Sequence, residues 1–215
     1  MQQYWDQIES LFRERLPEDS QRYFAPGASE KAIADLEKHI GLQLPDDFKA
    51  FYRVHNGQGK EVFGLVFGLE LLSIPRIQQE WDNWNALGDD LNADLAHAMS
   101  SEPKGYVKPL YLNPKWVPFT TDQTGTHIGM DFDPDHQGVV GQVITFGRNE
   151  NKKKVLARSL RDYIHLLVKQ LQTLDWSLDP EDGWEVRDKT YGKRHYHDWL
   201  EGQLRAPTET EGPND

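Results

Sequence analysis

The sequence predicts an α+β fold in which helices pack against a mainly antiparallel sheet. Helical spacing of apolar residues dominates the chain before Gly57 and returns after Ser159. Between these parts lie short apolar runs separated by Gly, Pro and Asp, which is typical of strands joined by turns. Because the strands between Trp116 and Ala157 follow one another through short turns, with helices grouped before and after them, the pattern predicts an antiparallel sheet in an α+β arrangement.

Each helix is marked by its apolar spacing or by its end residues. Ser29 is a good N-cap for the second helix, and Gly41 supplies the left-handed residue that ends it. Pro45 and two aspartates suit the first turn of the third helix. Pro75 opens a fourth helix, and Ser159 caps the last. The helices are expected within Tyr4–Leu16, Ser29–Gly41, Leu44–Gly57, Pro75–Trp84, Leu91–Met99 and Ser159–Leu171.

The clearest strand signals lie in Trp116–Phe146, the stretch around which the rest of the chain is organised. Apolar runs there are interrupted by Asp133-Pro134 and Gly138, which mark a turn between two strands. The expected strands are Val62–Phe67, Leu69–Ile74, Trp116–Phe119, His127–Phe132, Val139–Phe146 and Val155–Ala157.

The domain organisation follows from these elements. Residues 1–25 form an N-terminal helix, and residues 26–173 form the main domain with a loop-rich insertion at about 88–108. Residues 174–215 form a C-terminal extension whose aromatic residues can fold back over the domain. The final residues are small, polar and acidic, so we expect them to be disordered.

Composition restricts the classes of partner. The 215 residues contain no cysteine and carry a formal net charge of −11, which repels nucleic acid and would attract a basic protein. No signal peptide pattern is visible at the N-terminus, and no apolar run is long enough to span a membrane. We therefore expect a cytoplasmic protein with a protein partner, no nucleic acid and no membrane contact.

Three carboxylates give the strongest hint of chemistry. Asp131, Asp133 and Asp135 alternate like the first ligands of a calcium loop, but His136 and Gln142 replace the required Gly and Glu. On a strand, Asp131 and Asp133 share one face, where they could serve as acid and base or as metal ligands. The competing interpretation is that these carboxylates accept hydrogen bonds from turn amides.

No other pattern supports catalysis. The chain has no phosphate-binding loop, zinc-protease helix, dinucleotide fingerprint or nucleophile elbow. His195 and His197 are a close pair, but their charged neighbours favour a solvated segment. Lys152–Lys154 are expected in solvent at a turn. The sequence therefore predicts neither an enzyme nor a cofactor, and no metal site.

An ordered set of motifs resembles the SUKH superfamily over about residues 26–171. In the N-terminal half they are Gly27-Ala-Ser29-Glu30, Leu44-Pro45-Asp46-Asp47-Phe48 and His55-Asn56-Gly57. In the C-terminal half they are Trp116-Val-Pro-Phe, Asp122, Gly129-Met-Asp131-Phe-Asp133-Pro134, Gly138, Gly141-Gln142-Val143-Ile144 and the helix from Ser159. The resemblance implies an α+β fold and a non-catalytic binding role. The insertion and the tail after Asp175 depart from the common pattern.

Three hypotheses about function follow, two from the resemblance and one from the carboxylates. The first is a bacterial immunity protein that neutralises a toxin by direct binding, and the acidic net charge suits a cationic toxin. The second is a regulatory scaffold in cell-wall synthesis or signalling. The third is a metal-dependent hydrolase built on Asp131, Asp133 and His136. For the binding hypotheses, Asp122, Asp131 and Asp133 are the expected polar contacts, with Trp116 as a packing neighbour or anchor.

Overall fold

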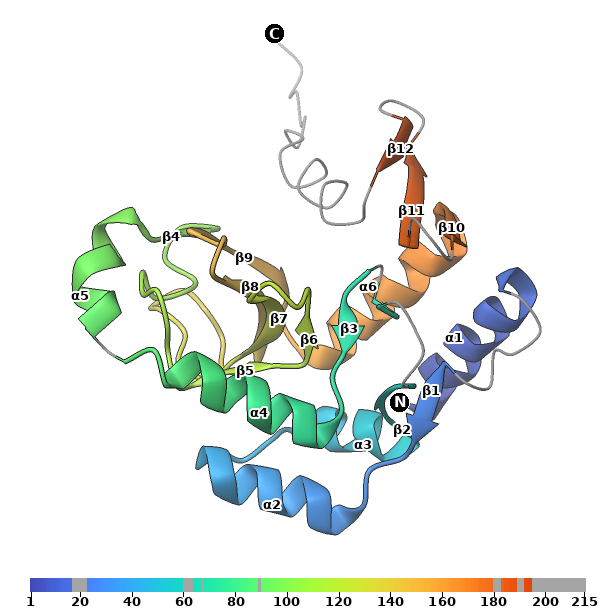
Figure 1. Cartoon of the computed structure of the whole chain (residues 1–215), viewed down its shortest axis with the longest axis horizontal. Coiled ribbons are helices and arrows are strands. Elements are labelled where there is room, and N and C mark those ends of the chain that lie inside the picture. Colours follow the sequence, from blue (N-terminus) through green and yellow to red (C-terminus); the bar gives the residue numbers. More distant parts are fainter. Residues whose placement is uncertain are drawn as a thin grey trace, which may run out of the picture.

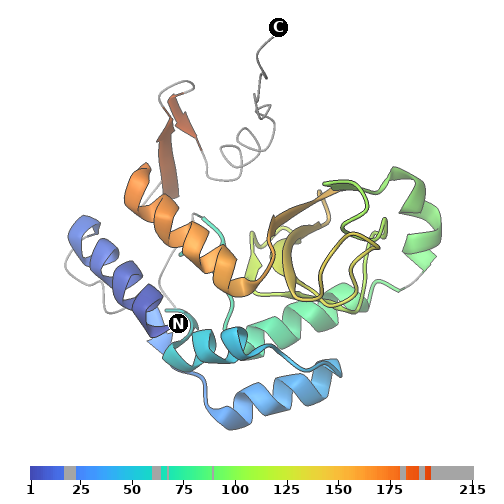
Figure 2. The same cartoon turned by 180° about the vertical axis from the view of Figure 1, so that it is seen from behind.

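A computed structural model shows a five-stranded sheet flanked by helices, with a small C-terminal sheet beyond the last helix. It describes residues 1–16, 23–59, 64–66, 68–88, 90–179, 183–188 and 192–194. In Figure 1 the large sheet and the short helix α5 occupy one end of the molecule, and α1 and the C-terminal strands occupy the other. The view from behind shows α1 and α6 side by side (Figure 2). This arrangement confirms the α+β prediction.

The helices agree with the sequence signals. Ser29 accepts a hydrogen bond from the Ala32 amide, and Gly41 adopts a left-handed φ of 69°. Ser159 caps the last helix through the Asp162 amide. The helices are α1 (Gln2–Arg15), α2 (Glu30–Ile40), α3 (Asp46–Val54), α4 (Ile74–Asn85), α5 (Asp90–Leu95) and α6 (Leu160–Thr173), with a 3-10 turn at Ala96–Ala98.

The central sheet has the order β4-β9-β8-β7-β5. Its strands are β4 (Ser100–Glu102), β9 (Lys152–Ala157), β8 (Gln142–Gly147), β7 (Thr126–Asp131) and β5 (Trp116–Pro118). Neighbours pair antiparallel except β4 and β9, which are parallel. The predicted insertion at 88–108 therefore contains an edge strand as well as the predicted short helix. Its local sequence carries no strand signal, because β4 is created by pairing with residues about 50 positions away in the chain.

Side chains on the two faces of this sheet enter two different cores. The larger core joins Val117, Ile128, Met130 and Val143 to α1, α2, α3 and α6. The smaller core joins Trp116, Ile144 and Phe146 to Trp84 of α4 and to Val107 and Leu112. The second face is thus covered by α4 and by the 107–112 segment that follows the insertion.

The remaining strands form small sheets. β1 (Phe24–Pro26) pairs with β2 (His55–Gln58), and β3 (Glu70–Leu71) pairs with β6 (Thr120–Thr121). β10 (Asp175–Asp179), β11 (Gly183–Asp188) and β12 (Gly192–Arg194) form an antiparallel sheet. The predicted strand at Val62–Phe67 lies mostly outside the described residues. So do His195, His197 and the final segment predicted to be disordered.

The C-terminal strands return to the N-terminal helix. Trp176 and Trp184 are buried, and their ring centroids lie 5.7 and 5.6 Å from that of Phe12. Arg15 of α1 covers the Trp176 ring and donates a hydrogen bond to the Leu174 carbonyl. Aromatic pairs at such distances stabilise a structure beyond the area they bury. The extension is therefore held by α1.

Candidate functional site

The carboxylates singled out from the sequence lie where β7 ends and in the turns on either side of that strand. Asp131 ends β7, opposite Trp116 of β5 and Gln142 of β8. Its carboxylate accepts hydrogen bonds from the Gln142 side chain and the Asp133 amide, both at 2.9 Å. Burial raises the pKa of Asp131 to about 6, although these hydrogen bonds act in the opposite direction. Asp131 therefore lies inside the protein and links the end of β7 to β8 and to the turn that follows β7.

Two of the four residues expected to contact a partner do not lie at the surface. Trp116 and Asp131 both have 0% of their surface exposed. Trp116 is the packing neighbour rather than an anchor, because its ring faces Phe146 in the smaller core. A partner could reach neither side chain without opening the sheet. Any role in binding would therefore have to be indirect.

Asp133 is half-buried and ties together segments on either side of β5. Its two oxygens accept hydrogen bonds from Lys108 Nζ at 2.7 Å and from Asn113 Nδ2 at 3.0 Å. Partial burial works against ionisation of Asp133, but these two hydrogen bonds outweigh it and lower its pKa. Asp133 therefore anchors the segment that follows the insertion to the β7–β8 turn.

Asp122 organises the turn between β6 and β7. It accepts hydrogen bonds from the amides of Thr124 and Thr126 and from the Thr124 hydroxyl, at 2.8 to 2.9 Å. Burial opposes ionisation, but these donors together lower the pKa of Asp122. The turn-stabilising interpretation of an aspartate therefore fits Asp122, and it fits Asp131 through the Asp133 amide, whereas the hydrogen-bond donors to Asp133 are side chains.

The metal-site hypothesis finds no support in this geometry. Among the residues that the structure describes, no three His, Asp or Glu side chains lie close enough to hold a metal ion together. Asp131, Asp133 and His136 are therefore not brought into one ligand set. The His136 ring instead contacts the neighbouring Asp135 carboxylate at 3.1 Å.

A buried lysine is the feature that sequence reasoning missed. Lys153 was expected in solvent, but it has 0% exposure on β9. Its amine donates to the Glu150 carbonyl at 2.6 Å and lies 5.7 and 5.9 Å from the ring centroids of Trp116 and Tyr111. Burial lowers the pKa of Lys153 to about 8. The sequence contained one signal of this burial. Side chains alternate between the two faces of a strand, so Lys153 lies on the same face as the apolar Val155.

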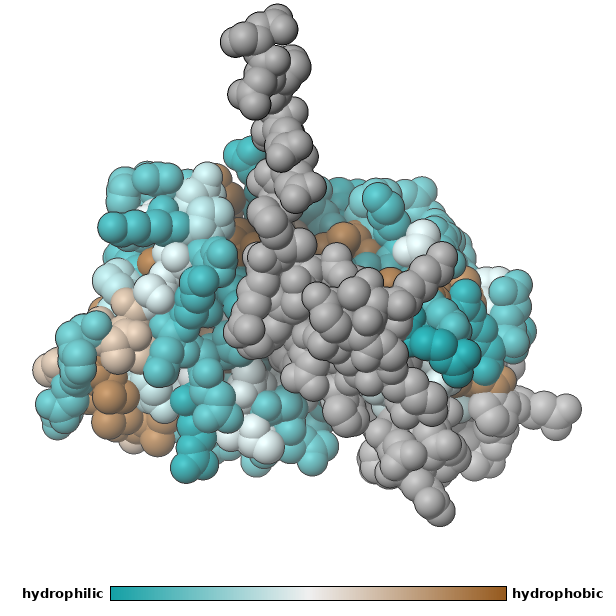
Figure 3. Space-filling model, turned by 90° about the horizontal axis from the view of Figure 1, so that it is seen from above, coloured by the Kyte–Doolittle hydropathy of each residue, from teal (hydrophilic) through white to brown (hydrophobic). Residues whose placement is uncertain are grey.

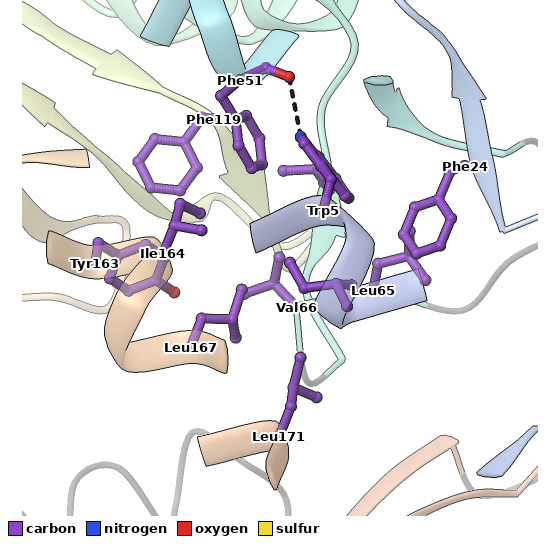
Figure 4. A pocket seen from close by; sticks show the side chains of 12 residues that line it. Trp5, Phe24, Phe51, Leu65, Val66, Phe119, Tyr163, Ile164, Leu167 and Leu171 are labelled. Atoms are coloured by element: carbon purple, nitrogen blue, oxygen red, sulfur yellow. Dashed lines mark hydrogen bonds between the residues drawn. The ribbon is translucent and has the colours of Figure 1, made fainter. Parts of the chain in front are cut away.

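Two hollows lie near the sheet and the helices. A cleft of about 450 Å³ runs between the Met99–Pro109 segment and the 135–137 turn, and Lys104, His136 and Lys152 line it. The other is a cavity of about 20 Å³ between α1, α3 and α6, surrounded almost wholly by apolar side chains (Figure 4). That volume admits roughly one water molecule, and the apolar walls offer it few partners. The small cavity is a packing feature of the core.

Known proteins similar to this chain include regulators of the cell wall and of glucan synthesis. The SMI1 / KNR4 family (SUKH-1) matches residues 27–165. The cell wall biosynthesis/cell cycle regulator smi1 of Schizosaccharomyces pombe is 31% identical over 73% of this chain and 33% of its own length. The glucan synthesis regulatory protein of Neurospora crassa is 25% identical over 85% of this chain and 40% of its own.

A further relative extends the same pattern. The cell wall assembly regulator SMI1 of Saccharomyces cerevisiae is 25% identical over 81% of this chain and 41% of its own length. This chain thus spans about a third to two fifths of the length of these relatives. No helix in the described part of the chain has both the length and the apolar character needed to cross a membrane. Because the family match covers well over half of the residues, the chain belongs to the SMI1/KNR4 family (SUKH-1).

Proposed function

We propose that this chain is a non-catalytic, protein-binding regulator that acts in cell-wall synthesis or in the signalling that controls it. The observation that carries this proposal is the similarity to fungal cell-wall regulators over about three quarters or more of the chain. The relatives are named as regulators, and regulation by a chain of this kind proceeds through contacts with other proteins. The same proposal places the protein in the cytoplasm.

The geometry around β7 supports a binding role over a catalytic one. Each carboxylate that could have served as acid, base or ligand is used by its own neighbours. Asp131 accepts a hydrogen bond from Gln142, and Asp133 accepts hydrogen bonds from Lys108 and Asn113. Asp122 accepts hydrogen bonds from its own turn. A general base must be able to reach a substrate proton, and the buried Asp131 has no such access.

Deletion and complementation in the source organism test the regulatory role. We expect loss of the gene to increase sensitivity to dyes that bind the cell wall and to change glucan content. The full chain should restore both, whereas a variant that does not fold should restore neither. Unchanged wall sensitivity and glucan content in the deletion strain would contradict the proposal.

The net charge of −11 favours one second candidate, an immunity protein that binds a cationic toxin. Deletion separates the two roles. An immunity protein leaves the wall phenotype unchanged and is required for growth beside a toxin-producing neighbour. Co-purification of a basic toxin with the full chain, at one-to-one stoichiometry, would favour immunity over wall regulation.

A further inference from the structure

The segment between α4 and β4 is unusual in its charge. Between Arg76 and Lys104 the sequence contains no Lys or Arg but has six carboxylates: Glu80, Asp82, Asp89, Asp90, Asp94 and Glu102. Three of them form ion pairs, Glu80 with Arg76, Asp82 with His39 and Glu102 with Lys152. Asp90 and Asp94 are exposed on α5, and their side chains make no ion pair with any residue that the structure describes. Their charges are thus available to a partner.

The same helix leaves apolar side chains uncovered. No residue of α5 is buried. Leu91 and Leu95 are only half-buried, and Leu87, in the turn before the helix, is 47% exposed. Within the described ranges, Leu87 and Val140 are the two large apolar residues that are exposed. Figure 3 shows apolar residues gathered at the end of the molecule where α5 lies.

Polar contacts help to hold α5 in place. The Asn92 side chain accepts hydrogen bonds from the amides of Tyr111 and Leu112 and donates one to the Leu112 carbonyl, at 2.8 to 3.0 Å. Three such bonds fix the helix against the chain that covers the smaller core. Leu91 also packs against that core, but it and Leu95 are only half-buried, so both leave apolar surface in contact with water.

The spacing on α5 places an apolar row beside an acidic row. Leu91 and Leu95 are four residues apart, as are Asp90 and Asp94, so each pair lies along one side of the helix. A second copy of this chain would bring the same aspartates together, which like-charge repulsion disfavours. A segment that presents cationic and apolar side chains side by side would match both rows.

We propose that the α5 surface, formed by Leu87, Asp90, Leu91, Asp94 and Leu95, docks a protein segment that carries Lys or Arg beside Leu, Ile or Phe. This inference rests on the proposed protein-binding function and gives it a location and a partner chemistry. The apolar row supplies buried area on binding, and the acidic row selects a basic segment and speeds the encounter.

The experiment uses the full chain and a fluorescein-labelled synthetic peptide with Lys and Leu at helical spacing, followed by anisotropy. We expect saturable binding that weakens roughly tenfold in Leu87→Ser/Leu95→Ser and again in Asp90→Asn/Asp94→Asn, and that weakens as salt screens the charges. The matched controls are Val140→Ser for the apolar pair and Glu14→Gln/Asp46→Asn for the charges. These controls remove equivalent exposed groups elsewhere and should bind like the wild type.

Three results would overturn the inference: no binding by the wild type, equal loss in the control variants, or equal binding of a peptide with Glu in place of Lys. Complementation of the deletion strain separates this failure from that of the proposed function. If α5 variants that fold but no longer bind the peptide restore the wall phenotype, the regulatory role stands and the α5 surface is excluded from it.

Discussion

Lys153 gives the sharpest prediction, because its environment changes the pH dependence of stability in a known direction. Burial lowers its pKa from 10.5 to about 8. Each pKa unit corresponds to about 1.4 kcal/mol, so deprotonation of this lysine in both the folded and the unfolded chain raises the free energy of unfolding by about 3 kcal/mol. The sign follows from proton counts. Between pH 8 and 10.5 the unfolded chain binds the proton and the folded chain does not, so stability rises with pH.

The test is urea unfolding of wild type and Lys153→Met between pH 7 and pH 9.5. Over this range, the two pKa values predict that the free energy of unfolding of the wild type rises by about 2 kcal/mol relative to the variant. Other titrating groups cancel in the difference. Lys152→Met is the matched control, because the neighbouring lysine has 55% of its side chain exposed. Parallel pH profiles for wild type and Lys153→Met would refute the reasoning.

Three further predictions concern the strand end, the sheet and the C-terminal sheet. Burial raises the pKa of Asp131 to about 6, so the wild type should lose about 2 kcal/mol relative to Asp131→Asn from pH 4.5 to pH 7, measured by urea unfolding. Gly129→Ala should lower the free energy of unfolding by about 2 kcal/mol or more, measured by thermal or urea unfolding. The new Cβ would lie 2.6 Å from the Phe146 ring and would clash with the Val117 carbonyl on the neighbouring strand. Phe12→Ala should cost about 3 to 5 kcal/mol and shift tryptophan emission to the red as Trp176 meets water.

Each of these has a control. Gly41→Ala meets no neighbour within 4 Å and should cost only the left-handed backbone penalty of about 1 kcal/mol. For Phe12, a loss no larger than that of Leu11→Ala, a half-buried position on the same helix, would contradict the aromatic contact. For Asp131, parallel pH profiles of wild type and Asp131→Asn would show that folding does not raise the pKa of this carboxyl.

Local signals in the sequence identified the helices because their causes are local. A serine caps the free amide three residues later, and a glycine ends a helix by adopting a left-handed backbone, so both act within one helical turn. The capping roles of Ser29, Gly41 and Ser159 could therefore be assigned from neighbouring residues alone. The site was harder to assign. Asp131 is buried because Trp116 and Gln142 meet it from the neighbouring strands, and Lys153 is buried beside aromatic rings about 40 residues away in the chain. Such burial depends on packing between residues that are far apart in the chain, and the spacing of apolar residues along the sequence does not reveal it.

The folding unit extends beyond the residues that define the family. The match covers residues 27–165, but Trp5, Ile8 and Phe12 of α1 belong to the same core as α2, α3 and α6. The indole of Trp5 donates a hydrogen bond to the Phe51 carbonyl at 3.0 Å, which joins α1 to α3 inside that core. Trp176 and Trp184 then cover α1 from outside the match. Since α1 and these C-terminal tryptophans share buried contacts with the matched residues, they complete the core of the domain, while α5 remains at the surface.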